Sequence, residues 1–148
     1  MATRPLTSDG YTHRLTIGAS RRRVFRALTT IEGLTGWWAS SATGSAGAGG
    51  RFDLGFGGLG ETITMQVDRA QPPAVVTWTC LRHSGLPDWD GTTITFELAP
   101  EAGGTGLDFR HVGLVPDLEC YGQCRAGWER FLSSLRAYTE SGRGAPFA

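Results

Sequence analysis

The chain has 148 residues, of which 40% are hydrophobic and 19% are charged, and its 14 basic and 14 acidic residues give a formal net charge of zero. This mixture is typical of a globular domain with a core of its own, so we expect a single domain over residues 1–148. Zero net charge argues against broad binding to nucleic acid or to an anionic membrane, because both need a surplus of basic groups.

The composition also indicates where the protein works. Lys and Asn are absent and Gly and Ala are abundant, a bias typical of a GC-rich bacterial genome. Residues 1–10 lack the apolar stretch of a signal peptide, and no segment approaches the roughly 20 apolar residues of a membrane span. Three cysteines, Cys80, Cys120 and Cys124, favour free thiols in a reducing compartment. We therefore expect a cytoplasmic protein.

The first third of the chain predicts one strand followed by two short helices. Apolar and polar residues alternate over residues 11–17, which predicts a strand with one buried face. Ser20 is placed to cap a helix, and Thr30 is placed to cap a second one. Gly36 should interrupt that second helix just before Trp37.

The middle of the chain predicts a loop and then an antiparallel sheet. Residues 40–50 are mostly Gly, Ser and Ala, which indicates a flexible loop. Five segments after it alternate as strands do when one face is buried, and with the first strand they make a sheet of about six. Their inward residues are Phe52, Leu54 and Phe56; Ile63, Met65 and Val67; Val76, Trp78 and Cys80; Ile94, Phe96 and Leu98; and Leu107, Phe109 and His111.

The last segment has the period of a helix. Its apolar residues recur at steps of three and four, and they are Tyr121, Cys124, Trp128, Phe131, Leu135 and Tyr138. Asp117 can cap the start, and Gly142 lies just past the end. The predicted fold class is therefore α+β: an antiparallel sheet of about six strands curved around a long C-terminal helix, with two short helices after the first strand.

Seven stretches spread over almost the whole chain carry a family resemblance. They are residues 19–29, 37–38, 49–52, 72–78, 91–98, 104–113 and 127–135. In this order and spacing they resemble the START-like or SRPBCC superfamily, which has the helix-grip fold. Within it, the chain is most similar to the family named for activators of the heat-shock protein 90 ATPase. The resemblance implies a cavity between sheet and helix, without a shared set of catalytic residues.

Three motifs that can indicate a cofactor favour ordinary structure here. Residues 55–60 match G-x-G-x-x-G, but strand-like residues follow in place of the helix that a dinucleotide site needs, so we predict a hairpin turn. Cys80 and His83 are three apart, which puts them on opposite faces of a regular strand. Cys120 and Cys124 alone do not complete a zinc site. We expect no metal and no cofactor.

His111 and Glu61 are the candidate catalytic residues. His111 shares strand parity with Phe109, so its imidazole should point into the cavity, where it can donate or accept a proton near neutral pH. The alternative is a histidine whose nitrogens are satisfied by a backbone or Trp partner. Glu61 is the weaker candidate, because a lone carboxylate is usually exposed. The basic run at residues 21–23 predicts a solvated helix face.

The candidate ligand-binding residues are mostly aromatic, and they fill the core, wall a pocket, or do both. They are Trp37, Trp38, Phe56, Met65, Trp78, Phe96, Phe109, His111, Cys124, Trp128 and Phe131. Trp128 should be buried against the strand that carries Phe109 and His111. Gly127 beside it suggests the close approach of another element.

The function predicted first is the binding of a small apolar or aromatic molecule between the sheet and the C-terminal helix. The alternative is an enzyme of the polyketide cyclase, aromatase or hydrolase kind that uses His111 and Glu61. A third hypothesis, a co-chaperone of heat-shock protein 90, rests on the family resemblance, and 148 residues leave no room for the separate N-terminal domain of the eukaryotic activators. The expected partner is a small molecule, with neither nucleic acid nor membrane, and a homodimer stays open.

Overall fold

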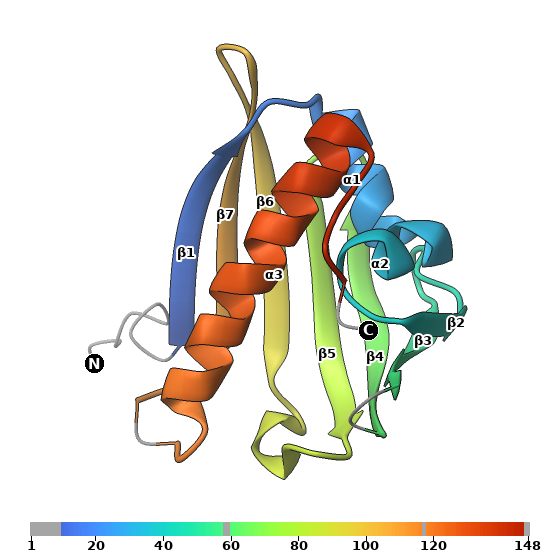
Figure 1. Cartoon of the computed structure of the whole chain (residues 1–148), viewed down its shortest axis with the longest axis vertical. Coiled ribbons are helices and arrows are strands. Elements are labelled where there is room, and N and C mark those ends of the chain that lie inside the picture. The colour runs from blue at the N-terminus through green and yellow to red at the C-terminus, as the bar shows by residue number, and fades with distance from the viewer. Residues whose placement is uncertain (1–9, 58–59, 117, 147–148) are drawn as a thin grey trace.

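The computed structural model describes residues 10–57, 60–116 and 118–146. Within these residues one antiparallel sheet has the strand order β1-β7-β6-β5-β4-β3-β2 (Figure 1). The strands are β1 (Gly10–Ile17), β2 (Ser41–Gly44), β3 (Arg51–Phe56), β4 (Glu61–Gln71), β5 (Val75–His83), β6 (Thr93–Glu101) and β7 (Gly104–Val112). The helices are α1 (Arg21–Thr29), α2 (Ile31–Trp37) and α3 (Tyr121–Ser141), with a short 3-10 helix, η3 (Pro87–Trp89).

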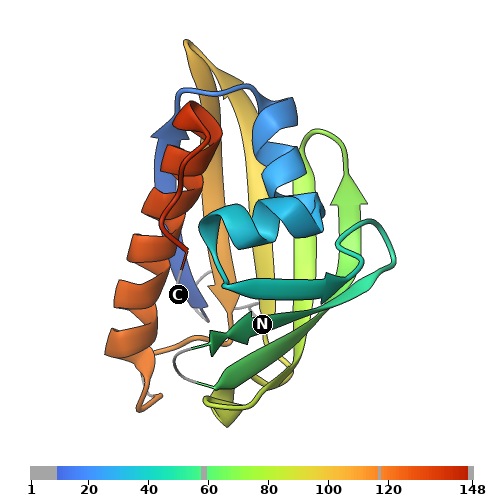
Figure 2. The same cartoon turned by 45° about the vertical axis from the view of Figure 1, so that its right-hand side comes forward.

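The sheet curves around α3, which confirms the predicted helix-grip arrangement. The long helix crosses one face of the sheet diagonally, and α1 and α2 lie on the same side (Figures 1 and 2). The helix α1 packs over β5, β6 and β7, and α2 lies next to β2. The apolar stripe of α3 and the inner faces of the strands form one buried core. No helix in the described part of the chain is long and apolar enough to cross a membrane.

The strand faces follow the alternation in the sequence. Leu107, Phe109 and His111 of β7 are all buried, and the other predicted inward residues are buried as well. In the register of β1 and β7, Tyr11 lies opposite His111 and Leu15 lies opposite Leu107, so the inward sets of the two strands coincide. A register that slipped by one residue would turn these side chains to solvent, so burial of one face specifies the pairing.

The helix ends also follow from sequence. Ser20 accepts a hydrogen bond from the backbone N–H of Arg23, and Thr30 accepts one from Gly33, so both predicted N-caps are confirmed. Gly142 ends α3 in the left-handed region at φ 85°, as expected of a glycine just past a helix. Cys120 occupies the N-cap position of α3, and Asp117 lies outside the described residues.

Two local expectations were wrong. Part of the segment 40–50 is not a loop, because Ser41–Gly44 forms β2 and pairs with β3, which makes seven strands in the described chain. Small polar residues carry no strand pattern, so the backbone pairing decides. The helix α2 also continues through Gly36 to Trp37. A Cβ at Gly36 would overlap the ring of Tyr138, so this glycine permits close contact between α2 and α3.

Candidate functional site

A cleft of about 210 Å³ opens between the N-terminal half of α3, the β5–η3 segment and the facing ends of β3 and β4. We call it the indole cleft, because three of the five Trp side chains line it. Its lining residues are Trp38, Phe56, Glu61, Ile63, His83, Leu86, Trp89, Gln123, Cys124, Gly127, Trp128, Arg130 and Phe131.

The candidate residues separate into two groups. The structure brings Trp38, Phe56, Cys124, Trp128 and Phe131 to the indole cleft, together with the catalytic candidate Glu61. The remaining ligand-binding candidates are buried in the core and do not line the cleft. They are Trp37, Met65, Trp78, Phe96, Phe109 and His111.

Trp128 connects α3 to β7 and forms one wall of the cleft. It is 2% exposed, and its ring centroid lies 4.5 Å from that of Phe109, which confirms the predicted burial against β7. Its Nε1–H donates a hydrogen bond to Nδ1 of His111 at 3.0 Å. The expectation for Gly127 was wrong, because a Cβ there would meet nothing within 4 Å. Gly127 lines the cleft and leaves space open on that side.

Both ring nitrogens of His111 are engaged. Because Nδ1 accepts from the Trp128 indole, the ring proton of the neutral form is on Nε2, which donates to Oγ1 of Thr92 at 2.8 Å. Thr92 in turn donates to the carbonyl of Trp89 at 2.6 Å. Burial, reinforced by the nearby His83, lowers the pKa of His111 to about 3. The ring faces inward, but it does not line the cleft, so the prediction that it points into the ligand cavity was wrong. The alternative, a histidine satisfied by a Trp partner, is confirmed, and the ring acts as a neutral link between α3 and the sheet.

The 3-10 helix η3 supplies a wall of the cleft that was not predicted from the sequence. Trp89 stacks on Trp128 with ring centroids 5.8 Å apart and an interplanar angle of 12°. Its Nε1–H donates to the sulfur of Cys124 at 3.3 Å. Pro87 at the first position of η3, with Asp88 after it, is a pattern typical of a helical turn and is the feature that could have indicated this element.

His83 reaches the cleft because β5 contains a bulge. The register of β4 and β5 shifts between Thr64 and Met65, which leaves Leu81 as an extra residue on β5. Cys80 and His83 are therefore both buried, contrary to the expectation from regular alternation. Among the residues that the structure describes, no three His, Cys, Asp or Glu side chains are placed to hold a metal ion.

The cysteines are buried and free. Burial raises the pKa of Cys124 to about 12, with a further contribution from Cys120, and burial also raises the pKa of Cys80 to about 12. A thiolate is the nucleophilic form of cysteine, so Cys124 stays a neutral thiol in the cleft wall at neutral pH.

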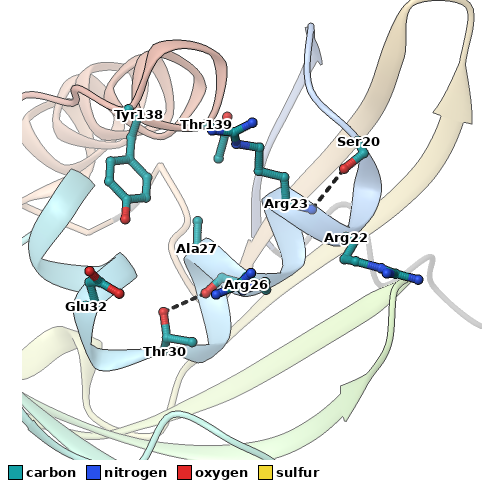
Figure 3. A pocket seen from close by; sticks show the side chains of 10 residues that line it. Ser20, Arg22, Arg23, Arg26, Ala27, Thr30, Glu32, Tyr138 and Thr139 are labelled. Atoms are coloured by element: carbon teal, nitrogen blue, oxygen red, sulfur yellow. Dashed lines mark hydrogen bonds between the residues drawn. The ribbon is translucent and has the colours of Figure 1, made fainter.

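A second hollow of about 440 Å³ lies between α1, α2 and the C-terminal end of α3 (Figure 3). Its lining includes Arg22, Arg23 and Arg26, and Figure 3 shows Arg23 extending towards Thr139 of α3. Arg22 and Arg23 are exposed, as predicted for a solvated helix face. Charged guanidinium groups keep their hydration at such a surface, so this hollow is poorly suited to an apolar ligand.

A family profile and a similar solved structure place the chain in the same family. The profile of the family described as activator of Hsp90 ATPase homolog 1-like protein matches residues 18–140. A solution structure of the Aha1 dimer from Colwellia psychrerythraea is similar, with 30% identity and a TM-score of 0.79 over 91% of this chain and 98% of that one. No curated protein sequence matches the chain.

Two structures at lower identity share the fold. CalU16 from Micromonospora echinospora is 22% identical with a TM-score of 0.71, over 92% of this chain and 76% of that one. DynU16, from the dynemicin biosynthetic locus, is 20% identical with a TM-score of 0.72, over 92% of this chain and 49% of that one.

The first prediction concerns the dual role of Trp128 in packing and hydrogen bonding. Trp128→Ala should lower the free energy of unfolding by about 3–5 kcal/mol, because it leaves a cavity in the core. Trp128→Phe keeps most of the ring volume but removes the donor to His111, so it should cost about 1–3 kcal/mol. Urea denaturation of both variants measures these values. Equal stability of the Phe variant and the original protein would contradict the role given to this hydrogen bond.

The second prediction is a loss of stability on acidification. Burial lowers the folded-state pKa of His83 to about 4, against the opposing field of Asp90, and that of His111 to about 3. In the unfolded chain both rings take up protons near pH 6.5, so between that pH and about 4 the unfolded state binds more protons. The urea midpoint should therefore fall from pH 7 to pH 5, with a shallower slope in a His83→Asn variant. A midpoint that does not change would show that both rings titrate normally.

Proposed function

We propose that this chain, which belongs to the family of activator of Hsp90 ATPase homolog 1-like proteins, binds a small flat aromatic or apolar molecule in the indole cleft. The observation that carries the proposal is the convergence of Trp38, Trp89, Trp128 and Phe131 on one open concavity with few polar groups. Sites of this composition are the usual places where proteins bind small organic molecules.

The wall behind the cleft is rigid. Trp38 stacks between Trp37 and Trp78, with ring centroids 5.3 Å and 5.7 Å away, and its centroid lies 5.2 Å from that of Trp128. Aromatic rings packed on several sides cannot change rotamer without opening the core. A preformed apolar wall favours binding, because a ligand does not have to order it.

The size of the cleft favours a compact ligand. At about 210 Å³ it is smaller than the roughly 300–1,000 Å³ typical of sites for drug-sized molecules. A molecule of two fused rings matches this space better than a long lipid chain does. Gly127 contributes to the space, since it has no side chain on the face of α3 that borders the cleft.

An enzyme is the less supported alternative. Both nitrogens of His111 are committed to Trp128 and Thr92, and the Cys124 thiol stays protonated at neutral pH. Among the described residues, Glu61 then remains as the one carboxylate in the cleft lining. A co-chaperone role is supported by membership of the family alone. If the protein does not stimulate ATP hydrolysis in an Hsp90 ATPase assay, this role is excluded.

Self-association is a secondary proposal, and the similar Colwellia protein supports it because its structure is described as a dimer. Among the described residues, Leu81 is the one large hydrophobic side chain that is exposed, at 38%, so a dimer contact would be mainly polar. Light scattering measures the outcome directly. We expect twice the chain mass of 15.9 kDa, and a monomer mass at high protein concentration would contradict the dimer.

Filling the cleft from α3 tests the proposed function. Gly127→Leu places a branched apolar side chain where a Cβ meets nothing within 4 Å, so the fold should persist while the cleft becomes occupied. Affinity for an uncharged fluorescent aminonaphthalene probe, measured by its emission and by displacement with naphthalene, should fall at least about tenfold, equivalent to about 1.4 kcal/mol.

The matched control is Gly122→Leu. Gly122 belongs to the same helix, is exposed, has nothing within 4 Å of its Cβ position and does not line the cleft. This variant should bind the probe as the original protein does. Equal affinity of the Gly127→Leu variant and the original protein, or no probe binding to either, would rule out the indole cleft as the ligand site.

A further inference from the structure

His83 is held at the cleft in one orientation. The bulge at Leu81 turns its ring to the inner face of the sheet, where the residue is 5% exposed. The ring packs edge-to-face on Trp89, with centroids 4.9 Å apart and planes at 71°. Its backbone N–H donates to a carboxylate oxygen of Asp90 at 2.9 Å, which fastens the end of β5 to the segment after η3. The imidazole therefore has a defined position when a ligand arrives.

The hydrogen bonds of His83 decide which ring nitrogen carries the proton. Nδ1 accepts the backbone N–H groups of Gly85 at 3.1 Å and Leu86 at 3.0 Å. A nitrogen that accepts two hydrogen bonds has no proton of its own, so the neutral ring is protonated on Nε2. Burial lowers the pKa of this ring to about 4, and it is neutral at pH 7. Nε2 is then a hydrogen-bond donor.

This donor is left without a partner among the described residues. Nε2 of His83 makes no hydrogen bond to another residue in the described part of the chain, and the side chain belongs to the cleft lining. When a ligand excludes water from the cleft, a donor left without an acceptor costs free energy, so an acceptor on the ligand is favoured there. His111 offers no such group, because both of its nitrogens are already bonded.

The charges around the cleft indicate an acceptor without charge. Glu61 and Arg130 line it, one of each sign. The Arg130 guanidinium is on the exposed side, 5.9 Å from the centre of the Phe131 ring. A Cβ on Gly85 would overlap the Glu61 carboxylate, so this negative charge lies against the turn that His83 holds. An anionic ligand group beside His83 would be desolvated near a like charge, which is unfavourable.

We propose that the ligand carries an uncharged oxygen acceptor, such as a ring ketone, and that His83 donates the Nε2–H hydrogen bond that orients it in the indole cleft. This inference rests on the proposed function, because it names the chemical class of the molecule that the cleft binds. The aromatic walls contact the ring system, and His83 distinguishes a ring that bears a carbonyl from a plain hydrocarbon.

Two probes and two variants test the proposal. The probes are 1-indanone and indane, which share their rings and differ in the carbonyl. His83→Asn keeps an acceptor at the Nδ1 position, so the contacts to Gly85 and Leu86 can persist, but it removes the Nε2 donor. His83→Gln is the matched control, because its amide N–H₂ can occupy the Nε2 position. Dissociation constants come from ¹H–¹⁵N chemical-shift titrations of each protein with each probe.

The measured quantity is the ratio of the indane dissociation constant to the 1-indanone dissociation constant. The hydration free energy of each free probe is the same for every variant, so it cancels when the ratios of two variants are compared. His83→Asn should lower this ratio about tenfold, as expected for a carbonyl left without a donor, and His83→Gln should change it less than about threefold. An unchanged ratio in the Asn variant would overturn the role of His83 while leaving the proposed function intact. Absence of binding by both probes would contradict the proposed function itself.

Imidazole ¹⁵N spectra provide a test that needs no variant. At pH 7 the His83 ring should show the Nε2-protonated tautomer, and its Nε2 signal should shift with 1-indanone and much less with indane. A proton found on Nδ1, or an Nε2 signal that is unaffected by 1-indanone at saturation, would exclude the proposed hydrogen bond even if the variants fail to fold.

Discussion

The hydrogen bond from Trp128 to His111 is the constraint on which the indole cleft depends. A helix packed on a sheet by apolar contacts alone can shift or rotate at small cost, because those contacts are not directional. A buried indole donor that faces a single imidazole acceptor removes this freedom. It fixes which residues of α3 face β7, and therefore which ones, including Cys124 and Phe131, border the cleft.

The same bond begins a chain that returns to the cleft. His111 donates to Thr92, and Thr92 donates to the carbonyl of Trp89, whose ring stacks on Trp128. Hydrogen bonds in series polarise one another, and a low-dielectric interior strengthens each of them. Two walls of the cleft, from segments distant in the sequence, are thus held together by a chain of neutral groups. The lowered pKa of His111 follows from this burial, since a charged ring would have no compensating partner there.

The structural features that follow from the periodicity of apolar residues were predicted correctly from the sequence. Alternation identified the inward face of every strand from β3 to β7, and the three-and-four spacing identified α3 and the burial of Trp128. A regular alternation of apolar and polar residues does not reveal where a strand bulges. The bulge at Leu81, which brings His83 into the cleft, was therefore not predicted. Gly127 shows a related limit, because a glycine that permits close packing and one that leaves open space look alike in a sequence.

The sequence predicted a set of aromatic residues for the candidate site, but it did not predict which of them line the cleft and which are buried in the core. Trp78 and Phe96 have the same strand pattern as residues that border the cleft, and only the course of η3 and the position of α3 decide which rings are covered. That course depends on the hydrogen bonds of His83 to Gly85 and Leu86, which join a side chain to the backbone of a turn. Such contacts leave no periodic pattern in a sequence.

Binding of a flat apolar molecule against the three indoles of the cleft can be measured directly from the NMR signals of the protein's five indole N–H groups. In a ¹H–¹⁵N titration with naphthalene, ring-current shifts should appear at Nε1 of Trp38, Trp89 and Trp128, which line the cleft, and be small at Trp37 and Trp78, which do not. Shifts confined to Trp37 and Trp78, or no shift of any indole at saturating naphthalene, would contradict binding in the indole cleft.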